Sequence, residues 1–424
     1  MGHAFLFSLI LFGLLVSGLL AQSGQILTFM IVFLVYLFAG IYFRPDKVRL
    51  AVSRDISHDR VLHGAHVTIQ LSITNQGSNL EEVLLEEVDA GHYTLVEGAI
   101  NLITSLRPGE KLIWSYRVRA DRGFYLFTGL KARASDHFDL MSRSLSVRVT
   151  GRFMALPIAY KLQRIVIRPR RTKIYSGFIP ARSGGQGIEF FGVREHQPSD
   201  PPRLINWKAS ARHQHSLFVN EFEQERVADV GLILDGRERS YGGSEQGSLF
   251  ESSISAAATL ADACLNDGNR VGLFIYGRAI NWTFPGYGNV QKERILLSLA
   301  NAKLGQHQVF DKLENLPLSF FPALSQLIFI SPLQKDDLPT LFLLRSRGYQ
   351  VLVISPNTFI LKNIMTDDPD SQIGWRLACL ERNLMLQRLK QGGVKVLSWS
   401  IDIPFTQIMN AYSIANAYSN PRQP

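Results

Sequence analysis

The densest group of charged and aromatic side chains in this sequence lies between residues 187 and 223. It combines carboxylates, guanidinium groups, a lysine and one tryptophan, residue types that form ion-pair networks, bind phosphate or nucleic acid, or dock a partner protein. Opposite charges alternate here at mixed spacings around a single large aromatic residue. This pattern favours a structural clasp, meaning a set of ion pairs that fixes the segment between two domains, and a partner-binding surface is the alternative. The candidate residues for either role are Glu189, Arg194, Glu195, Asp200, Arg203, Trp207, Lys208 and Arg212.

The sequence lacks the signatures of the common catalytic sites. It has no GxxxxGK[ST] phosphate loop, no GxSxG nucleophile and no CxxC pair. His213 and His215 have the spacing of one strand face, but no cysteine or acidic residue accompanies them at ligand spacing. Cys264 and Cys379 fall in apolar, helix-like contexts, which indicates a reducing compartment rather than a disulfide framework. We therefore expect neither an enzyme nor a bound cofactor.

The elements that would position a site change character along the chain. From residue 226 onward, short apolar runs alternate with helix-like stretches, the pattern of a doubly wound α/β domain. The first run, Val230–Leu234, is typical of a strand buried on both faces of a parallel sheet, and Asp235 follows it. Ligands of such sheets bind at the carboxyl ends of the strands, which singles out Asp235 and the segment after Ile330. Further strands are expected at 271–276, 327–331, 351–355 and 394–399, and helices at 249–265, 290–303, 336–347, 375–390 and 406–417.

Residues 44–155 have the pattern of β structure. Val67–Ile73 alternates apolar and polar residues, which is the period of a half-buried strand. Strand-like runs recur at 83–88, 112–118 and 124–127, separated by turns rich in glycine. The spacing predicts an antiparallel β-sandwich of about six to eight strands. Residue types of a catalytic site do not cluster in it, so a structural or docking module is expected.

Two uncharged runs open the chain, Ala4–Ala21 and Ile26–Phe43. Each would form a helix of about 27 Å, close to the roughly 30 Å hydrocarbon core of a bilayer. Basic residues follow the second run from Arg44 to Arg60, and such residues stay on the cytoplasmic side. We predict a two-helix transmembrane hairpin in a multi-pass protein of the inner cell membrane, with both termini cytosolic. The net charge of +9 suits an anionic membrane surface as well as nucleic acid.

The segment that begins at Gly187 resembles the signature of the DUF58 family, which has the form G-x-E-F-x-x-x-R-E-Y-x-P-G-D-x-x-R-x-I-D-W-K-x-x-A-R. The matching residues are Gly187, Glu189, Phe190, Arg194, Glu195, Pro198, Asp200, Arg203, Ile205, Trp207, Lys208, Ala211 and Arg212, and the departures are His196, Ser199 and Asn206. Shorter similarities at 122–125, 129–130, 136–140 and 285–288 extend the resemblance over nearly the whole chain.

The resemblance implies an α/β domain similar to a von Willebrand factor A domain, and a partnership with MoxR-type AAA+ ATPases in chaperone or assembly roles. No enzyme activity is attached to the family. A-type domains often hold Mg²⁺ through Asp-x-Ser-x-Ser, a later Thr and a carboxylate after the fourth strand, because Mg²⁺ needs hard oxygen ligands. Here Arg237 and Arg239 stand in place of the two hydroxyls, the loop 305–315 has no Thr or Ser, and Ser331-Pro332 supplies no carboxylate. The resemblance thus implies a degenerate site at Asp235 and no metal.

These observations predict an α+β multidomain membrane protein with four parts: the transmembrane hairpin at 1–43, the antiparallel β-sandwich at 44–155, the connecting signature segment at 156–225, and the doubly wound, von Willebrand factor A-like α/β domain at 226–424. The expected function is that of a membrane-anchored cytosolic interaction or assembly protein. Its expected partners are the lipid bilayer and a MoxR-type AAA+ ATPase, with which it would act in maturation of an envelope-associated complex.

Two alternative functions stay open. The first is a metal-dependent hydrolase or nuclease that uses Glu195, Asp200 or Asp235. The second is a membrane-tethered nucleic-acid binder that uses the basic residues around Trp207. Nucleic acid is not the expected partner, because stacking platforms for single strands usually present several aromatic side chains and this segment offers one tryptophan.

Overall fold

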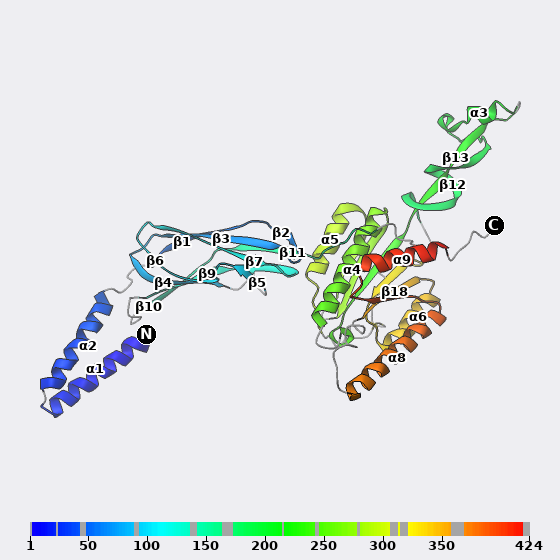
Figure 1. Ribbon diagram of the computed structural model, residues 1–424. Helices are drawn as coiled ribbons and strands as arrows, with labels where there is room; N and C mark the ends of the chain where they lie inside the picture. The colour runs from blue at the N-terminus through cyan, green and yellow to red at the C-terminus, as the bar shows by residue number, and fades with distance from the viewer. Residues whose placement is uncertain are drawn as a thin grey trace. The chain divides into compact units, whose positions relative to one another are not determined.

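The computed structural model describes residues 2–22, 24–42, 48–88, 93–135, 142–162, 173–213, 216–241, 246–277, 280–305, 313, 321–357 and 369–418 of the 424-residue chain. The chain divides into two compact units, Met1–Leu156 and Pro157–Pro424. Figure 1 gives the course of the chain through both units.

The first unit opens with two helices, α1 (Gly2–Leu20) and α2 (Gly24–Tyr42). They pack against each other through Phe7, whose ring lies 5.2 Å from that of Tyr36. The predicted transmembrane hairpin is wrong, because no helix among the described residues is both long enough and apolar enough to cross a membrane. The multi-pass inner-membrane location that rested on this hairpin is corrected with it. Arg44 and Lys47 lie outside the described residues.

A β-sandwich completes the first unit. Its two main sheets have the orders β1-β3-β7-β5 and β10-β9-β4-β6, and a third, three-stranded sheet has the order β2-β11-β8. The strands are β1 (Leu50–Ile56), β2 (Arg60–Leu62), β3 (His66–Asn75), β4 (Leu80–Val88), β5 (Thr94–Glu97), β6 (Asn101–Leu106), β7 (Lys111–Arg119), β8 (Gly123–Phe127), β9 (Gly129–Ser135), β10 (Ser142–Val147) and β11 (Gly151–Leu156). These eleven strands of the described residues exceed the six to eight predicted, and two of them, β2 and β5, are too short to show an alternating pattern. The β2–β11 pair is also parallel rather than antiparallel.

The sandwich core is mostly apolar. The inward residues of β3, which are Val67, Ile69, Leu71 and Ile73, are fully buried, as their alternation predicts. Beside this core, the side chains of Arg54 and Glu87 are also buried and form an ion pair of 2.5 Å. Arg54 donates further hydrogen bonds to the carbonyl oxygens of Val149 and Gly129 and lies over the ring of Phe127. Burial raises the pKa of the Glu87 carboxyl, although Arg54 opposes the shift.

The second unit begins with a segment that packs on helix α4 (Gln246–Asn266), where Ser255 Oγ donates to the carbonyl oxygen of Ile158. A long antiparallel pair follows, β12 (Lys173–Glu195) with β13 (Phe218–Val227), and its register shifts at several points. The connection between these strands holds η1 (Pro202–Leu204) and α3 (Trp207–Ser210). We call β12, β13 and this connection the arm.

A six-stranded mixed sheet forms the centre of the second unit, with the order β16-β15-β14-β17-β18-β19. All neighbouring strands are parallel except the edge pair β15–β16. The strands are β14 (Asp229–Gly236), β15 (Arg270–Gly277), β16 (Asn281–Gly286), β17 (Gln326–Ile330), β18 (Gln350–Asn357) and β19 (Lys395–Ser400). Because successive side chains of β14 point to opposite faces, Leu232 and Leu234 join one core and Ile233 joins the other.

Helices cover both faces of this sheet (Figure 1). The core on one face includes residues of α4, α5 (Gly288–Ala300) and α9 (Phe405–Tyr418), and the core on the other includes residues of α6 (Leu338–Ser346) and α8 (Pro369–Gln391). Each helix and strand predicted from residue 226 onward lies at its predicted place to within a few residues, apart from α8, which begins six residues earlier. The edge strand β16 was not predicted, because its half-exposed residues give no continuous apolar run.

The buried ion pair of the sandwich yields a stability prediction. Arg54→Ala should lower the free energy of unfolding by about 3–5 kcal/mol, because the Glu87 carboxylate is then buried without its partner. Arg117→Ala is the matched control: its pair with Glu97 is exposed and should contribute about 1 kcal/mol or less. Chemical denaturation of the full chain measures both changes.

The sign of the pH dependence follows from the raised pKa of Glu87. A carboxyl whose pKa is raised in the folded state destabilises the fold increasingly as pH rises through that pKa. The loss of unfolding free energy caused by Arg54→Ala should therefore be smaller at about pH 4, where more of the carboxyl is protonated, than at about pH 8. An equal deficit at both values would contradict the buried-pair account.

Candidate functional site

The carboxyl end of β14 places Asp235 at the centre of the second unit. Its side chain is fully buried, since β14 lies between β15 and β17 in the sheet. The hydroxyl of Ser331, which follows β17, donates to Asp235 Oδ2 at 2.7 Å. The hydroxyl of Tyr241, in η2 (Glu238–Tyr241), donates to the backbone oxygen of Asp235 at 2.8 Å. The segment after Ile330 therefore meets Asp235, and these are the two places that the sequence singles out for a ligand.

Arg237 fills the space between two carboxylates at this edge of the sheet. Its Nε and Nη2 atoms donate to the two oxygens of Asp235 at 3.0 and 2.8 Å. On its other side, Nη1 and Nη2 donate to the two oxygens of Asp337 at 3.0 and 2.7 Å. The guanidinium also lies 5.0 Å from the ring centre of Tyr276. All three charged side chains are at most 1% exposed.

Asp337 is the residue of this site that sequence reasoning missed. It lies in η5 (Lys335–Asp337), six positions beyond Ser331, and reaches the site because η5 folds back under the end of β17. Its Oδ2 accepts a hydrogen bond from the backbone N–H of Gln334, so it also caps that turn. Burial raises the pKa of the Asp337 carboxyl above its ordinary value, against the opposing effect of Arg237. The capping pattern Gln-Lys-Asp-Asp is the signal that could have found it.

This arrangement is an internal ion-pair cluster. Where Mg²⁺ would need several oxygen ligands around one point, the guanidinium itself occupies the point between the two carboxylates. Within the described residues, no group of three or more His, Cys, Asp or Glu side chains is arranged to hold a metal ion. Arg239, the second arginine after Asp235, instead pairs with Asp336 at 2.7 Å on the surface.

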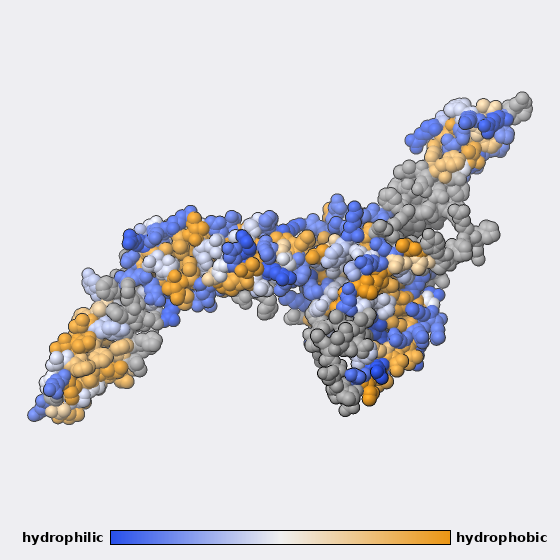
Figure 2. All heavy atoms as spheres, viewed as in Figure 1, coloured by the Kyte–Doolittle hydropathy of each residue, from blue (hydrophilic) through white to orange (hydrophobic). Residues whose placement is uncertain are grey.

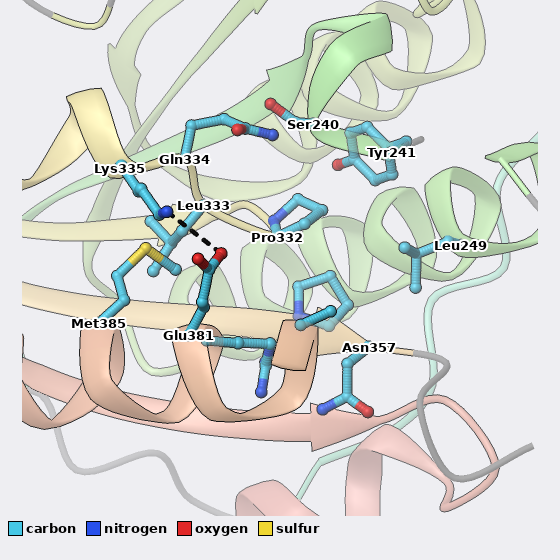
Figure 3. Close-up of a pocket in the computed structure, with 13 residues that line it drawn as sticks. Ser240, Tyr241, Leu249, Pro332, Leu333, Gln334, Lys335, Asn357, Glu381 and Met385 are labelled. Carbon is cyan, nitrogen blue, oxygen red and sulfur yellow. Dashed lines mark ion pairs between the residues drawn. The ribbon is translucent and has the colours of Figure 1, made fainter. Parts of the chain in front are cut away.

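A cavity of about 380 Å³ lies beside the cluster, at the ends of β17 and β18 (Figure 3). Its lining comes from η2, the turn after β17, the end of β18 and one side of α8. Lys335 and Glu381 form an ion pair of 3.1 Å between two of these elements. Arg382 donates to the hydroxyl and backbone oxygens of Ser355, and burial lowers its pKa to about 10.

In the arm, the structure joins three of the charged residues in the predicted segment. Arg194 donates to both oxygens of Asp200 at 2.7 and 2.6 Å, and its Nε lies 3.5 Å from Glu221 Oε1. Asp200 Oδ2 also accepts from the backbone N–H of Gln197 at 2.8 Å. These hydrogen bonds, above all those from Arg194, lower the pKa of Asp200 to about 2.

Trp207 does not have the burial that the clasp interpretation requires, because its residue is 68% exposed. It begins α3, whose N-cap is Asn206: Asn206 Oδ1 accepts from the backbone N–H of Ala209 at 2.9 Å. Asn206 Nδ2 donates to Asn220 Oδ1, and Ser210 Oγ accepts from the backbone N–H of Phe218. The turn that carries Trp207 is thus tied to β13 while the indole faces outward.

The other predicted residues of the segment do not enter a network. Glu195, Arg203, Lys208 and Arg212 are all exposed, and no ion pair joins them to any residue in the described part of the chain. Glu189 lies in β12, but its side chain is outside what the structure describes. Among the side chains that the structure describes, the mixed charges therefore form one local cluster around Arg194, and four charged side chains are exposed.

Comparison with known proteins gives a family match over part of this region. A family model described as "Protein of unknown function DUF58" matches residues 192–317, from the end of β12 to beyond α5. One relative, an uncharacterized protein YeaD of Bacillus subtilis strain 168, is 24% identical over 177 residues. The match covers 42% of this chain and 42% of that protein, so the chain spans less than half of the relative's length.

Likenesses to solved structures are faint. A CARDB domain of a Pyrococcus furiosus protein is 16% identical, with 27% of this chain and 92% of that one covered at a TM-score of 0.20. A FixG-related protein from Vibrio parahaemolyticus is 18% identical, with 26% and 97% covered at a TM-score of 0.18. TM-scores this low carry no argument about fold or function.

Removing Arg237 tests the buried cluster. Arg237→Ala leaves two carboxylates buried without a counter-charge, and should lower the free energy of unfolding by about 3–5 kcal/mol or more. Arg239→Ala, two residues away, breaks a half-exposed pair with Asp336 and should change it by about 1 kcal/mol or less. Equal effects of the two substitutions in denaturant unfolding would show that Arg237 does not hold the cluster.

The Arg194–Asp200 pair makes a prediction for titration. NMR should give Asp200 a pKa of about 2 in the wild-type chain. A lowered pKa means that the pair persists at neutral and mildly acid pH and is lost only as pH falls through about 2. Arg194→Ala should return the pKa of Asp200 to its ordinary value of about 3.9, whereas Arg203→Ala should leave it low.

Proposed function

We propose that this chain is a non-catalytic protein-interaction module that binds a MoxR-type AAA+ ATPase through its arm. We further propose that its α/β domain is von Willebrand factor A-like. The partner class comes from the resemblance of Gly187–Arg212 to the DUF58 signature, and the family match at residues 192–317 supports that resemblance. The proposal concerns binding and assembly, and assigns no reaction to the chain.

The observation that carries the proposal is the exposed position of Trp207 on a fixed turn. An exposed tryptophan side chain leaves a large apolar surface in contact with water, which is unfavourable in the free protein. Tryptophan is also among the residues that dominate binding energy at protein interfaces. Phe190 and Leu217 of the arm are also exposed. Because α3 is already tied to β13, little ordering is needed when a partner covers the indole.

The charges around Trp207 indicate what kind of surface the partner presents. Arg203, Lys208 and Arg212 are exposed cations that make no ion pair among the described residues. An acidic surface on the ATPase would complement them and would speed its association. Arg194 and Asp200 already pair with each other within the arm. We therefore expect this pair to stabilise the turn and not to contact the partner.

The cluster at the sheet edge supports a binding role over metal-dependent hydrolysis. Catalytic metals act through an open coordination position. Here the guanidinium of Arg237 uses its donors on Asp235 and Asp337, and both carboxylates are enclosed. The sheet order with a single antiparallel edge strand, β16, supports the A-type interpretation of the domain.

Binding of the purified full chain to a purified MoxR-type ATPase tests the proposal. Trp207→Ala should weaken binding at least tenfold, a loss of about 1.4 kcal/mol. Its stability should change by less than about 0.5 kcal/mol, since Trp207 is exposed. Trp282→Ala is the matched control, because it removes an exposed tryptophan of the same unit from β16.

Unchanged ATPase binding by Trp207→Ala would contradict the proposed surface. A second measurement tests the rival function, nucleic-acid binding. Fluorescence anisotropy with a single-stranded oligonucleotide should show no difference between the wild type and Trp207→Ala. Oligonucleotide binding that is lost in this variant, without any ATPase binding, would favour a nucleic-acid binder instead.

A further inference from the structure

Helix α8 carries an exposed apolar stripe. Ile373, Leu377, Leu380 and Leu384 are 64, 58, 60 and 55% exposed, although all four are large aliphatic residues in a regular helix. Their spacing of four, three and four residues places them within about 60° of one another around the helix axis. This is the spacing of the a and d positions of a coiled coil, with Leu377 and Leu384 at a and Ile373 and Leu380 at d.

The stripe is distinct from the face that α8 buries in its own domain. Met385, Leu386 and Leu389 belong to the core under the sheet, and all three lie in the C-terminal half of the helix. From Gln372 to Leu384, side chains are exposed or half-exposed. Glu381 and Arg382 tie this part of the helix to Lys335 and Ser355, but the four residues of the stripe stay exposed, so a partner along the stripe would bury them.

Charged residues beside the stripe indicate which partner fits. Arg376, just before Leu377, occupies the g position of one heptad, and Glu381, just after Leu380, occupies the e position of the next. In a parallel, in-register pair of α8 helices, each g residue faces the e residue five positions further on in the partner. Arg376 of each copy then faces Glu381 of the other, and the contact occurs twice by symmetry.

We propose that a second copy of this chain docks on the stripe, with the two α8 helices forming a short parallel coiled coil. An antiparallel pair would instead place g beside g and e beside e, where Arg376 and Glu381 find no opposite charge across the stripe. Glu381 also pairs with Lys335 of its own chain, but both side chains are largely exposed, so this contact does not bar the new one.

Disulfide trapping in the full chain tests the orientation. Leu380→Cys, in a chain whose half-buried Cys379 is replaced by serine, should oxidise to a covalent dimer, because d residues of a parallel pair face their own counterparts. Cys264 can stay, because it is buried and its burial raises the pKa of its thiol. Ala378→Cys in the same background is the control: it lies on the same helix but away from the stripe, and should not cross-link.

Analytical ultracentrifugation measures the association itself. Leu377→Asp should weaken dimerisation at least tenfold, whereas Leu343→Asp, at an exposed leucine of α6, should not. Arg376→Glu should weaken it through repulsion from Glu381, and the double variant Arg376→Glu/Glu381→Arg should restore it. A chain that stays monomeric, a dimer insensitive to Leu377→Asp, or cross-linking only between Leu377→Cys and Leu380→Cys copies would overturn the proposal.

Discussion

The position of the Arg237 guanidinium between Asp235 and Asp337 is the constraint on which the sheet edge of the second unit depends. Each carboxylate comes from a different element, one at the end of β14 and one in η5, and the guanidinium joins them with four hydrogen bonds. Tyr241 and Ser331 bind the same aspartate and bring η2 and the end of β17 to it. Because a buried charge without a partner is costly, these elements are held together as a group. The carboxyl ends of the strands, where ligands of parallel sheets usually bind, are thus cross-linked by internal ion pairs and hydrogen bonds.

A second buried pair, Arg54 with Glu87, plays a comparable part in the sandwich. Arg237 donates hydrogen bonds to both of its carboxylates, whereas Arg54 Nε and Glu87 Oε1 are buried without a hydrogen-bond partner. The arm differs, because Glu195, Arg203, Lys208 and Arg212 are exposed to water, where ion pairs contribute little to stability. Buried charges therefore hold each unit in shape, and exposed charges beside Trp207 are available to a partner.

The two proposed contact surfaces rest on the same physical fact, which is a large apolar side chain held outward by a regular element. On the arm, Asn206 and Ser210 fix the turn that carries Trp207. On α8, the helix itself aligns the four aliphatic residues of the stripe. The surfaces differ in chemistry. The basic residues around Trp207 suit an acidic partner, whereas Arg376 of one copy would face Glu381 of a second copy. Each can be disrupted without touching the buried clusters.

The sequence by itself determined the elements whose signals are local. The alternation in β3 and the apolar run of β14 predicted strands at the positions where the structure has them, because the burial of a strand determines which of its residues are apolar. The resemblance to A-type domains also implied that Arg237 replaces a metal-binding hydroxyl. Tertiary structure alone decided the rest. Asp337 reaches Arg237 only through the fold of η5, 100 residues further along the chain. The outward direction of Trp207 could not be predicted either, because an aromatic residue among charges is compatible with burial or exposure, and only the packing of neighbouring elements chooses between them. The transmembrane prediction was wrong. It rested on the length and lack of charge of two runs, whereas no described helix is long enough and apolar enough to cross a membrane.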